Sequence, residues 1–211
     1  MTPRIRRHRP REEFPLNIRL VSSRALVLGA VAFACLTGGT WHTHSPVSLA
    51  MESTAVGFLL AGCIGRIWCS VHIAGRKNAV VVAQGPYSVC RNPLYFFSMF
   101  AFMGAGLAFE SFTTLAIFTI VFFLTHWPTI LREERFLRGE FGADYDAYCA
   151  RVPRFFPKLS LYHAPATLTV DTRVFTKSLR ESGFIPLTYV AGQAVVLAHE
   201  AGVLPAFMKV W

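Results

Sequence analysis

The sequence predicts an all-α fold, an integral membrane helical bundle with about five transmembrane helices and amphipathic helices on the cytoplasmic side. The chain has 211 residues, of which 53% are hydrophobic and only 16% are charged. Its mean hydropathy of +0.42 is too apolar for an ordinary soluble domain. Several apolar runs approach the roughly 20 residues that a helix needs to cross the hydrocarbon layer. We therefore expect one domain embedded in a membrane.

Residues 1–24 are expected to form a basic cytoplasmic arm, because they carry several arginines and few apolar side chains. A first transmembrane helix is predicted over about Ala25 to Thr40. More apolar segments follow it, so we interpret it as a retained helix rather than a cleaved signal peptide. Polar residues and Pro46 then break the helix.

The second transmembrane helix is predicted over about Ala50 to Ala74, so that the first two spans occupy residues 25–74. At about 1.5 Å rise per residue this run is long enough for a hydrocarbon layer of roughly 30 Å. Arg66 lies inside the run. Its side chain either extends to the membrane interface or contacts an anionic cofactor or lipid group.

The middle of the chain is predicted to contain an antiparallel pair of transmembrane helices. Gly85 and Pro86 end an extended connection, since Gly-Pro stops a helix, and Pro93 suits the first turn of the third helix. Glu110 and Ser111 mark a tight reversal. The two helices are expected to run from Pro93 to about Phe109 and from about Phe112 to Leu131.

Beyond Leu131 the sequence becomes charged and amphipathic as far as about Ala150. Aromatic residues recur there near helical spacing. We interpret this stretch as the fourth helix leaving the bilayer or as a helix lying on its surface. Residues 159–211 are expected to comprise a polar linker, a basic interfacial helix over Arg173 to Arg180, and a last membrane helix over about Gly183 to Leu204.

The positions of lysine and arginine predict the orientation of the protein. The net charge is +9, and of the 21 basic residues all but Arg66 and Lys209 fall in the arm, around Arg76 to Arg91, or between Arg132 and Arg180. The positive-inside rule then places the N-terminus and the charged ends of the hairpin in the cytoplasm. We expect contact with membrane lipids and no nucleic-acid partner, because no aromatic-basic module accompanies the charge.

No metal site is expected from the cysteines and histidines. The five cysteines are scattered without paired spacing, which predicts neither a disulfide framework nor a zinc site. His42 and His44 follow the first helix, and two histidines alone are more typical of a solvated loop than of a metal centre.

Two charged clusters are expected to meet at the cytoplasmic end of the hairpin. They are Arg91, Asn92 and Tyr95 at the start of the third helix, and Arg132, Glu133 and Glu134 at the end of the fourth. A helix N-terminus with a nearby arginine suits a carboxylate, and a glutamate pair suits an ammonium group or a ribose diol. The clusters therefore match a zwitterionic amino-acid moiety. The alternative is that Arg91 pairs with one of the glutamates and only closes the hairpin.

Short motifs follow one another between about residues 62 and 157. They are Gly85-Pro86-Tyr87, Arg91-Asn92-Pro93-Leu94-Tyr95, Glu133-Glu134, Phe141-Gly142 with Tyr145 and Tyr148, and Val152-Pro153-Arg154 with Pro157. In order and spacing they resemble the signature of the isoprenylcysteine carboxyl methyltransferase family. The resemblance implies that residues 75–158 form a methyltransferase core, that S-adenosylmethionine is the methyl donor, and that a lipophilic acceptor enters from the bilayer.

The resemblance also implies roles for individual residues. Cofactor-binding roles are implied for Arg91, Asn92, Pro93, Leu94, Tyr95 and Glu133, and catalytic roles for Arg132 and Glu134. Asn92 departs from the family, which usually has histidine there; asparagine cannot take up a proton near neutral pH. The related phospholipid N-methyltransferases resemble this chain in having Asn-Pro, so amine methylation is an alternative.

The two acceptor classes differ in what they require. A carboxylate is already ionised and needs only an arginine such as Arg132 or Arg154 to hold it. An amine must lose a proton, for which Glu133, Glu134 or a tyrosine would be the base. The absence of an obvious histidine base at this site favours carboxylate or another acidic oxygen.

Two further functions stay open. Sterol-reductase-like membrane enzymes that use NADPH resemble this family in their C-terminal half, and a non-catalytic membrane module would use the motifs only for packing. A soluble-type dinucleotide fold is not expected, because Gly104-Ala105-Gly106 lies in a membrane helix without the strand that a phosphate-binding turn requires. Helix packing is the better explanation of these glycines.

Overall fold

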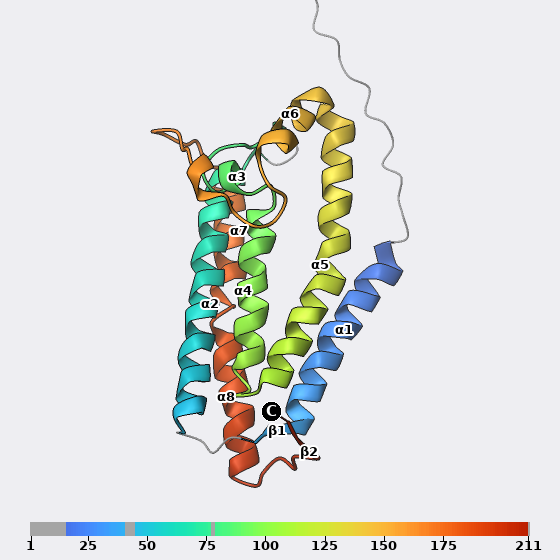
Figure 1. The fold of residues 1–211 in the computed structure, drawn as a ribbon, viewed down its shortest axis with the longest axis vertical. Helices are drawn as coiled ribbons and strands as arrows, with labels where there is room; N and C mark the ends of the chain where they lie inside the picture. Colours follow the sequence, from blue (N-terminus) through green and yellow to red (C-terminus); the bar gives the residue numbers. More distant parts are fainter. Residues whose placement is uncertain (1–15, 41–44, 77–78, 211) are drawn as a thin grey trace, which may run out of the picture.

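The computed structural model describes residues 16–40, 45–76 and 79–210, and within them the protein is an elongated bundle of helices (Figure 1). The helices are, in chain order, α1 (Leu16–Leu36), α2 (Pro46–Ile73), α3 (Pro86–Val89), α4 (Pro93–Leu107), α5 (Phe112–Phe141), α6 (Ala143–Arg151), the short 3-10 helix η1 (Leu159–Leu161), α7 (Thr172–Gly183) and α8 (Leu187–Glu200). Two short strands, β1 (Thr37–Gly39) and β2 (Met208–Val210), complete the described structure. The all-α membrane bundle predicted from the sequence is confirmed.

Among the described helices, α2 and α5 have the length and apolarity needed to cross a membrane. α4 and the part of α1 over Arg24–Leu36 are shorter apolar helices. α5 continues for 30 residues, and at about 1.5 Å per residue it exceeds the roughly 30 Å hydrocarbon layer. Its charged last turns therefore extend the membrane helix, and they do not form a separate helix on the surface.

α2 packs closely against α4 because small residues line their contact. A Cβ added at Gly62 would lie 2.9 Å from the backbone nitrogen of Ala101, and one added at Gly104 would lie 2.9 Å from the carbonyl oxygen of Ala55. Small residues let two helix backbones approach, which is a common packing solution in membranes. The interpretation of Gly104 as a packing residue is confirmed.

α7 and α8 follow one another alongside the bundle, from the end that carries α3 and α6 to the opposite end (Figure 1). α7 contacts α2, and α8 contacts both α4 and α2. The basic helix predicted over residues 173–180 is therefore present, but it runs beside a membrane helix. The helix predicted over residues 183–204 is shorter, since α8 covers residues 187–200 and Pro186 separates it from α7. It is not among the described helices that are long and apolar enough to cross a membrane.

β1 and β2 pair in parallel, with Thr37 opposite Met208 and Gly39 opposite Val210. The helix predicted to reach Thr40 is therefore wrong in its last residues, because α1 ends at Leu36. Glycines are poor helix residues, and the backbone groups of this extended segment find partners in β2. The strand pair ties the segment after α1 to the C-terminal part of the chain.

A buried polar cluster joins three segments at the end opposite α3 and α6. Glu110, between α4 and α5, is 3% exposed and has a φ of 53°, which few non-glycine residues adopt. Its carboxylate accepts hydrogen bonds from Ser48 Oγ of α2 at 2.6 Å and from Gln193 Nε2 of α8 at 3.2 Å. The reversal predicted at Glu110 and Ser111 is present, and hydrogen bonds from α2 and α8 stabilise it.

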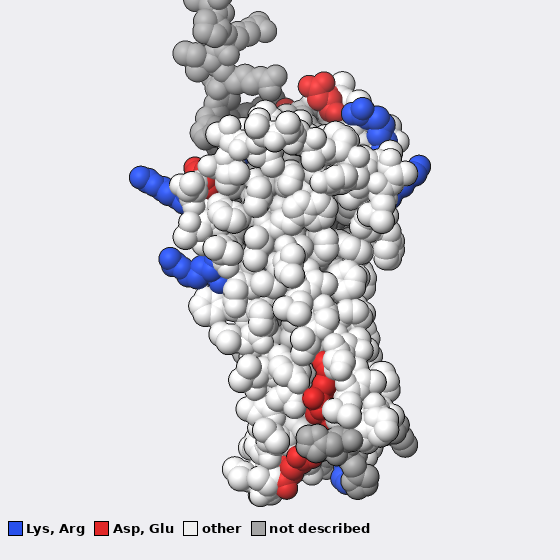
Figure 2. All heavy atoms as spheres, turned by 90° about the vertical axis from the view of Figure 1, so that its left-hand side faces the viewer, with Lys and Arg blue, Asp and Glu red and all other residues white. Residues whose placement is uncertain are grey.

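Charged side chains are unevenly distributed along the bundle. On the face in Figure 2, lysine and arginine lie mainly in the upper half, toward the end with α3 and α6, and uncharged residues cover most of the middle. This separation agrees with the clustering of basic segments in the sequence. That this end faces the cytoplasm stays a prediction of the positive-inside rule.

The close approach of α2 and α4 predicts that Gly104→Ala destabilises the bundle. The added methyl would lie 2.7 Å from Leu59 Cγ, and overpacking of this kind costs about 1–3 kcal/mol. Gly57→Ala is the matched control, because a Cβ at Gly57 meets nothing within 4 Å; it should leave stability unchanged or raise it by up to about 1 kcal/mol. Unfolding curves in detergent measure both variants. Equal shifts would contradict the packing described here.

Candidate active site

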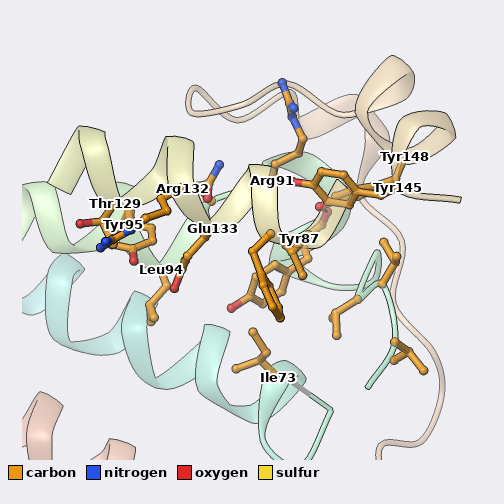
Figure 3. A pocket seen from close by; sticks show the side chains of 16 residues that line it. Ile73, Tyr87, Arg91, Leu94, Tyr95, Thr129, Arg132, Glu133, Tyr145 and Tyr148 are labelled. Atoms are coloured by element: carbon orange, nitrogen blue, oxygen red, sulfur yellow. Dashed lines mark hydrogen bonds between the residues drawn. The ribbon is translucent and has the colours of Figure 1, made fainter. Parts of the chain in front are cut away.

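A cavity of about 420 Å³ lies at the end of the bundle that carries α3 and α6. Its walls come from α2, α4, α5, α6 and the segment before and within α3 (Figure 3). Its polar lining consists of Tyr87, Arg91, Asn92, Tyr95, Thr129, Arg132, Glu133, Tyr145 and Tyr148. The rest is apolar and consists of Ile73, Val80, Val81, Val82, Leu94, Phe136 and Leu137. The volume falls within the range of about 300–1,000 Å³ typical of small-molecule and cofactor sites.

Glu134 is the centre of a buried polar network beside this cavity. It is 4% exposed, and its carboxylate accepts hydrogen bonds from Asn92 Nδ2 and Arg154 Nε, each at 3.0 Å. Arg91 Nη1 lies 3.4 Å from the same carboxylate. A carboxylate buried this deeply needs such partners. The network joins the start of α4, the second half of α5 and the segment after α6.

The segment from Gly85 to Arg91 is fixed by contacts with distant parts of the chain. Gly85 has a φ of 59°, and a Cβ there would collide with the ring of His72, so only glycine fits. The hydroxyl of Tyr148 donates to the carbonyl of Tyr87 at 2.7 Å. The N–H of Arg91 donates to the carbonyl of Pro153 at 2.9 Å. α6 and the segment that follows it therefore hold this part of the cavity wall in place.

The two adjacent glutamates of α5 have different surroundings. Glu133 lines the cavity together with Tyr95. Glu134 instead belongs to the buried network. Successive residues of an α-helix are about 100° apart around its axis, so the pair is divided between two faces of α5. Arg132 also lines the cavity and is exposed, which places it at the mouth.

Two buried polar atoms of the cavity wall have no hydrogen-bond partner among the described residues. They are the hydroxyl oxygen of Tyr87 and the Nε of Arg91. Leaving a buried polar group unpaired costs roughly 1–3 kcal/mol, so each such group calls for an explanation. A ligand that accepts hydrogen bonds would satisfy both, and the opposite charges of Arg91 and Glu133 suit a ligand that is itself zwitterionic.

The tyrosines at this end of the bundle are hydrogen-bond donors rather than bases. Burial raises the pKa of the hydroxyls of Tyr87, Tyr145 and Tyr148, and nearby acidic groups raise it further. The usual pKa of tyrosine is already about 10, so these hydroxyls stay protonated at neutral pH. Burial also raises the pKa of the Cys90 thiol to about 12, which leaves it unreactive as a nucleophile.

The structure brings together most of the residues that the sequence assigned to the site. Arg91, Asn92, Leu94, Tyr95, Arg132 and Glu133 line the cavity. Pro93 is buried at the start of α4 and does not line it. Glu134 does not line it either, and its contacts make it a positioning residue for Arg91 and Asn92. The alternative pairing of Arg91 with Glu134 is also present, but it leaves Arg91 in the cavity wall.

His126 is a residue near the site that the sequence analysis missed. It lies on α5, and its ring centroid is 5.8 Å from that of Tyr95. Its Nδ1 lies 3.2 Å from the carbonyl oxygen of Phe122, and no described residue hydrogen bonds to its Nε2. Thr129, three residues later, lines the cavity. Residues three apart share a helix face, and this spacing was the signal for His126.

Metal-ligating side chains do not gather in the described ranges. No three His, Cys, Asp or Glu side chains lie close enough there to share a metal ion. His42 and His44 lie outside the described residues, so their loop role stays a prediction.

Comparison with known proteins relates this chain to membrane methyltransferases and to metal-resistance proteins. Residues 66–144 match the phospholipid methyltransferase family model. The nickel-cobalt-cadmium resistance protein NccN of Alcaligenes xylosoxydans xylosoxydans is 35% identical over 184 residues, which cover 87% of this chain and 85% of NccN. The cobalt-zinc-cadmium resistance protein CzcN of Cupriavidus metallidurans is 38% identical over 168 residues, which cover 80% of this chain and 75% of CzcN. No solved structure matches the chain.

The network around Glu134 predicts that Glu134→Ala lowers the free energy of unfolding by about 3 kcal/mol or more, because it leaves Arg91 buried without its carboxylate. Asp146→Ala is the comparison. Asp146 pairs with Arg138 at 2.7 Å, but both side chains are more than half exposed, and exposed pairs contribute about 0–1 kcal/mol. Chemical unfolding in detergent measures both losses. Similar losses would show that the Glu134 network does not stabilise this end of the bundle.

Proposed function

Because this chain belongs to the family that contains NccN and CzcN, and its residues 66–144 match the phospholipid methyltransferase family, we propose that it is a membrane methyltransferase that uses S-adenosylmethionine. The observation that carries this proposal is the cavity, most of whose lining belongs to the matched segment, where Arg91 and Glu133 present opposite charges. The cavity lies at the ends of apolar helices. A lipophilic acceptor from the bilayer suits this position.

S-adenosylmethionine fits the residues of the cavity. Arg91 would hold its carboxylate, and the buried Nε of Arg91 has no other partner among the described residues. Glu133 would hold its ammonium group or ribose hydroxyls. The hydroxyl of Tyr87 offers a further donor, and the rings of Tyr145 and Tyr148 offer faces for a cationic or aromatic group. When bound, this cofactor supplies an electrophilic methyl group on a positively charged sulfur.

The contribution of the protein is mainly positioning, which can lower a barrier by roughly 7–11 kcal/mol. Glu134 holds Asn92 and Arg91, so both keep a fixed place at the start of α4. Tyr148 holds the backbone of Tyr87. The apolar residues 80–82 and Leu94 exclude water from one side of the cavity. This arrangement keeps polar groups fixed before any ligand binds.

We propose that the acceptor is a carboxylate, as in the isoprenylcysteine carboxyl methyltransferases that the motifs resemble. A carboxylate is ionised at neutral pH and needs a cation but no base. Arg132 lies exposed at the mouth of the cavity, whereas Arg154 is engaged with Glu134. Of these two arginines, Arg132 is therefore the better placed to meet the acceptor as it enters the cavity. The protonated state of Tyr87, Tyr145 and Tyr148 also supports an acceptor that requires no base.

Amine methylation is the second candidate, and two observations favour it. The matching family model is that of phospholipid methyltransferases, and Asn92 agrees with the Asn-Pro pair of that group. An amine acceptor needs a base. Glu133 lines the cavity, and the ring of His126 lies beside that of Tyr95. No described residue hydrogen bonds to the Nε2 of His126. Glu133 would take the proton, because His126 is not among the residues that line the cavity.

The topology and domain organisation are also proposals. We place the N-terminus, the basic arm and the cavity in the cytoplasm. The arm ends earlier than the predicted residue 24, because α1 begins at Leu16. Residues 25–74 form the first two spans and residues 75–158 form the catalytic core. The packing of α7 and α8 against α2 and α4 supports a structural role for residues 159–211.

The names of the relatives suggest a cellular role. NccN and CzcN are named for resistance to nickel, cobalt, cadmium and zinc. We propose that methylation of a lipophilic membrane component by this chain contributes to tolerance of such metals.

The cofactor assignment predicts that Glu133→Ala weakens S-adenosylmethionine binding by about tenfold or more, since it removes a charge-assisted contact. Tyr87→Phe should weaken binding severalfold while leaving stability unchanged or raised, because it deletes a hydroxyl that is unpaired without ligand. Glu140→Ala, on the exposed side of α5, is the control. Calorimetric titration of detergent-solubilised protein measures the affinities. Wild-type affinity in Glu133→Ala and Tyr87→Phe would refute the cofactor site.

The acceptor assignment predicts a base-labile product. Purified chain incubated with native lipids and S-adenosylmethionine labelled in its methyl group should transfer label into the lipid fraction. Mild alkali should then release the label as volatile methanol, because a methyl ester hydrolyses and an N-methyl group does not. Label that resists alkali would favour the amine alternative. Stronger heat stabilisation by NADPH than by S-adenosylmethionine would favour the reductase alternative instead.

A further inference from the structure

Arg66 is a charged residue inside the bundle that the proposed cofactor site does not use. It lies on α2, roughly two turns before the end of that helix at Ile73. Its Nη1 donates a hydrogen bond to Ser98 Oγ of α4 at 2.5 Å. Ser98 is buried, so the guanidinium points into the bundle. Of the two expectations for Arg66, this contact favours a role inside the bundle over extension to the membrane interface.

The charge of Arg66 is not balanced within the described part of the chain. It forms no ion pair with a described carboxylate, and its Nε is buried without a hydrogen-bond partner there. A guanidinium carries five N–H donors. A cation within a membrane span is costly and typically marks a functional site. An oxyanion supplied from outside the chain would satisfy both the charge and the free donor.

Arg66 lies just beyond the cavity, toward the middle of the bundle. Its partner Ser98 follows Tyr95 by about one turn on α4, and Tyr95 lines the cavity. On α5, His126 likewise lies about one turn from Thr129, which also lines the cavity. The ring centroids of Tyr95 and His126 are 5.8 Å apart. Polar groups of α2, α4 and α5 therefore gather at one level below the cavity.

We propose that Arg66 anchors the anionic headgroup of a lipophilic methyl acceptor, through a carboxylate or phosphate oxyanion. An amphiphile that meets a cofactor at this end of the bundle must place its head near the cavity and its chain among apolar helices. Arg66 is the cation that the described structure places at that level. A guanidinium binds carboxylate or phosphate with paired, charge-assisted hydrogen bonds. That the anion is a methyl acceptor rests on the proposed function; that Arg66 binds an anion does not.

The test measures binding without cofactor, to the full chain in nanodiscs of neutral phosphatidylcholine. The probes are brominated dodecanoate, its methyl ester and brominated dodecyl phosphate, and the readout is quenching of tryptophan fluorescence. Trp68 lies two residues from Arg66 on α2. The wild type should bind at least one anionic probe about tenfold more tightly than the ester, since only the anion pairs with the guanidinium. Which anion binds more tightly identifies the headgroup.

Arg66→Met should abolish this preference and Arg66→Lys should keep part of it. Arg173→Met, on the exposed part of α7, is the matched control and should bind like the wild type. Ser98→Ala keeps the charge but removes its hydrogen-bond partner, and it should reduce the preference severalfold even if Arg66→Met fails to fold. A wild type without preference for the anions, or a full preference in Arg66→Met or Ser98→Ala, overturns the proposal. A preference that depends on Arg66, in a protein that does not bind S-adenosylmethionine, would refute the methyltransferase function and leave the anion site standing.

Discussion

A carboxylate buried in apolar surroundings must be met by hydrogen-bond donors, and the end of this protein with the candidate active site is built around that constraint. Glu134 accepts hydrogen bonds from Asn92 and Arg154 and forms an ion pair with Arg91. These partners come from the start of α4 and from the segment after α6, which are far apart in the sequence. The requirement of one side chain therefore fixes three segments relative to one another, and the cavity wall follows from it.

A second buried glutamate has the same effect at the opposite end. Glu110 holds α2 and α8 to the turn between α4 and α5. Between the two ends the helices pack through small residues such as Gly62 and Gly104. The hairpin of α4 and α5 is thus fixed at both ends by polar contacts and in the middle by close backbone approach. A frame of this kind suits a site that depends on positioning.

The buried polar residues at this end differ in whether the protein itself supplies their hydrogen-bond partners. Glu134 and Asn92 are satisfied within the protein, whereas Arg91 and Tyr87 keep buried atoms without partners in the described structure. Groups of the second kind favour a bound ligand over an empty cavity. Arg66, further into the bundle, also has a buried Nε without a partner in the described structure. In the proposed enzyme these two levels correspond to a charged cofactor at the end of the bundle and an anionic amphiphile beside it.

The sequence by itself determined the membrane bundle, the hairpin and the charged clusters at its end, because hydropathy, proline and glycine are local signals. It also placed Arg91 and Glu133 in one site, since the reversal at Glu110 brings the ends of two helices together. Only the tertiary structure decided that Glu133 faces the cavity and Glu134 the network, because packing sets the rotation of a helix about its axis. The pairing of Arg66 with Ser98 and of β1 with β2 was decided in the same way. Those contacts join segments that meet only when the chain is folded, so local sequence patterns do not predict them.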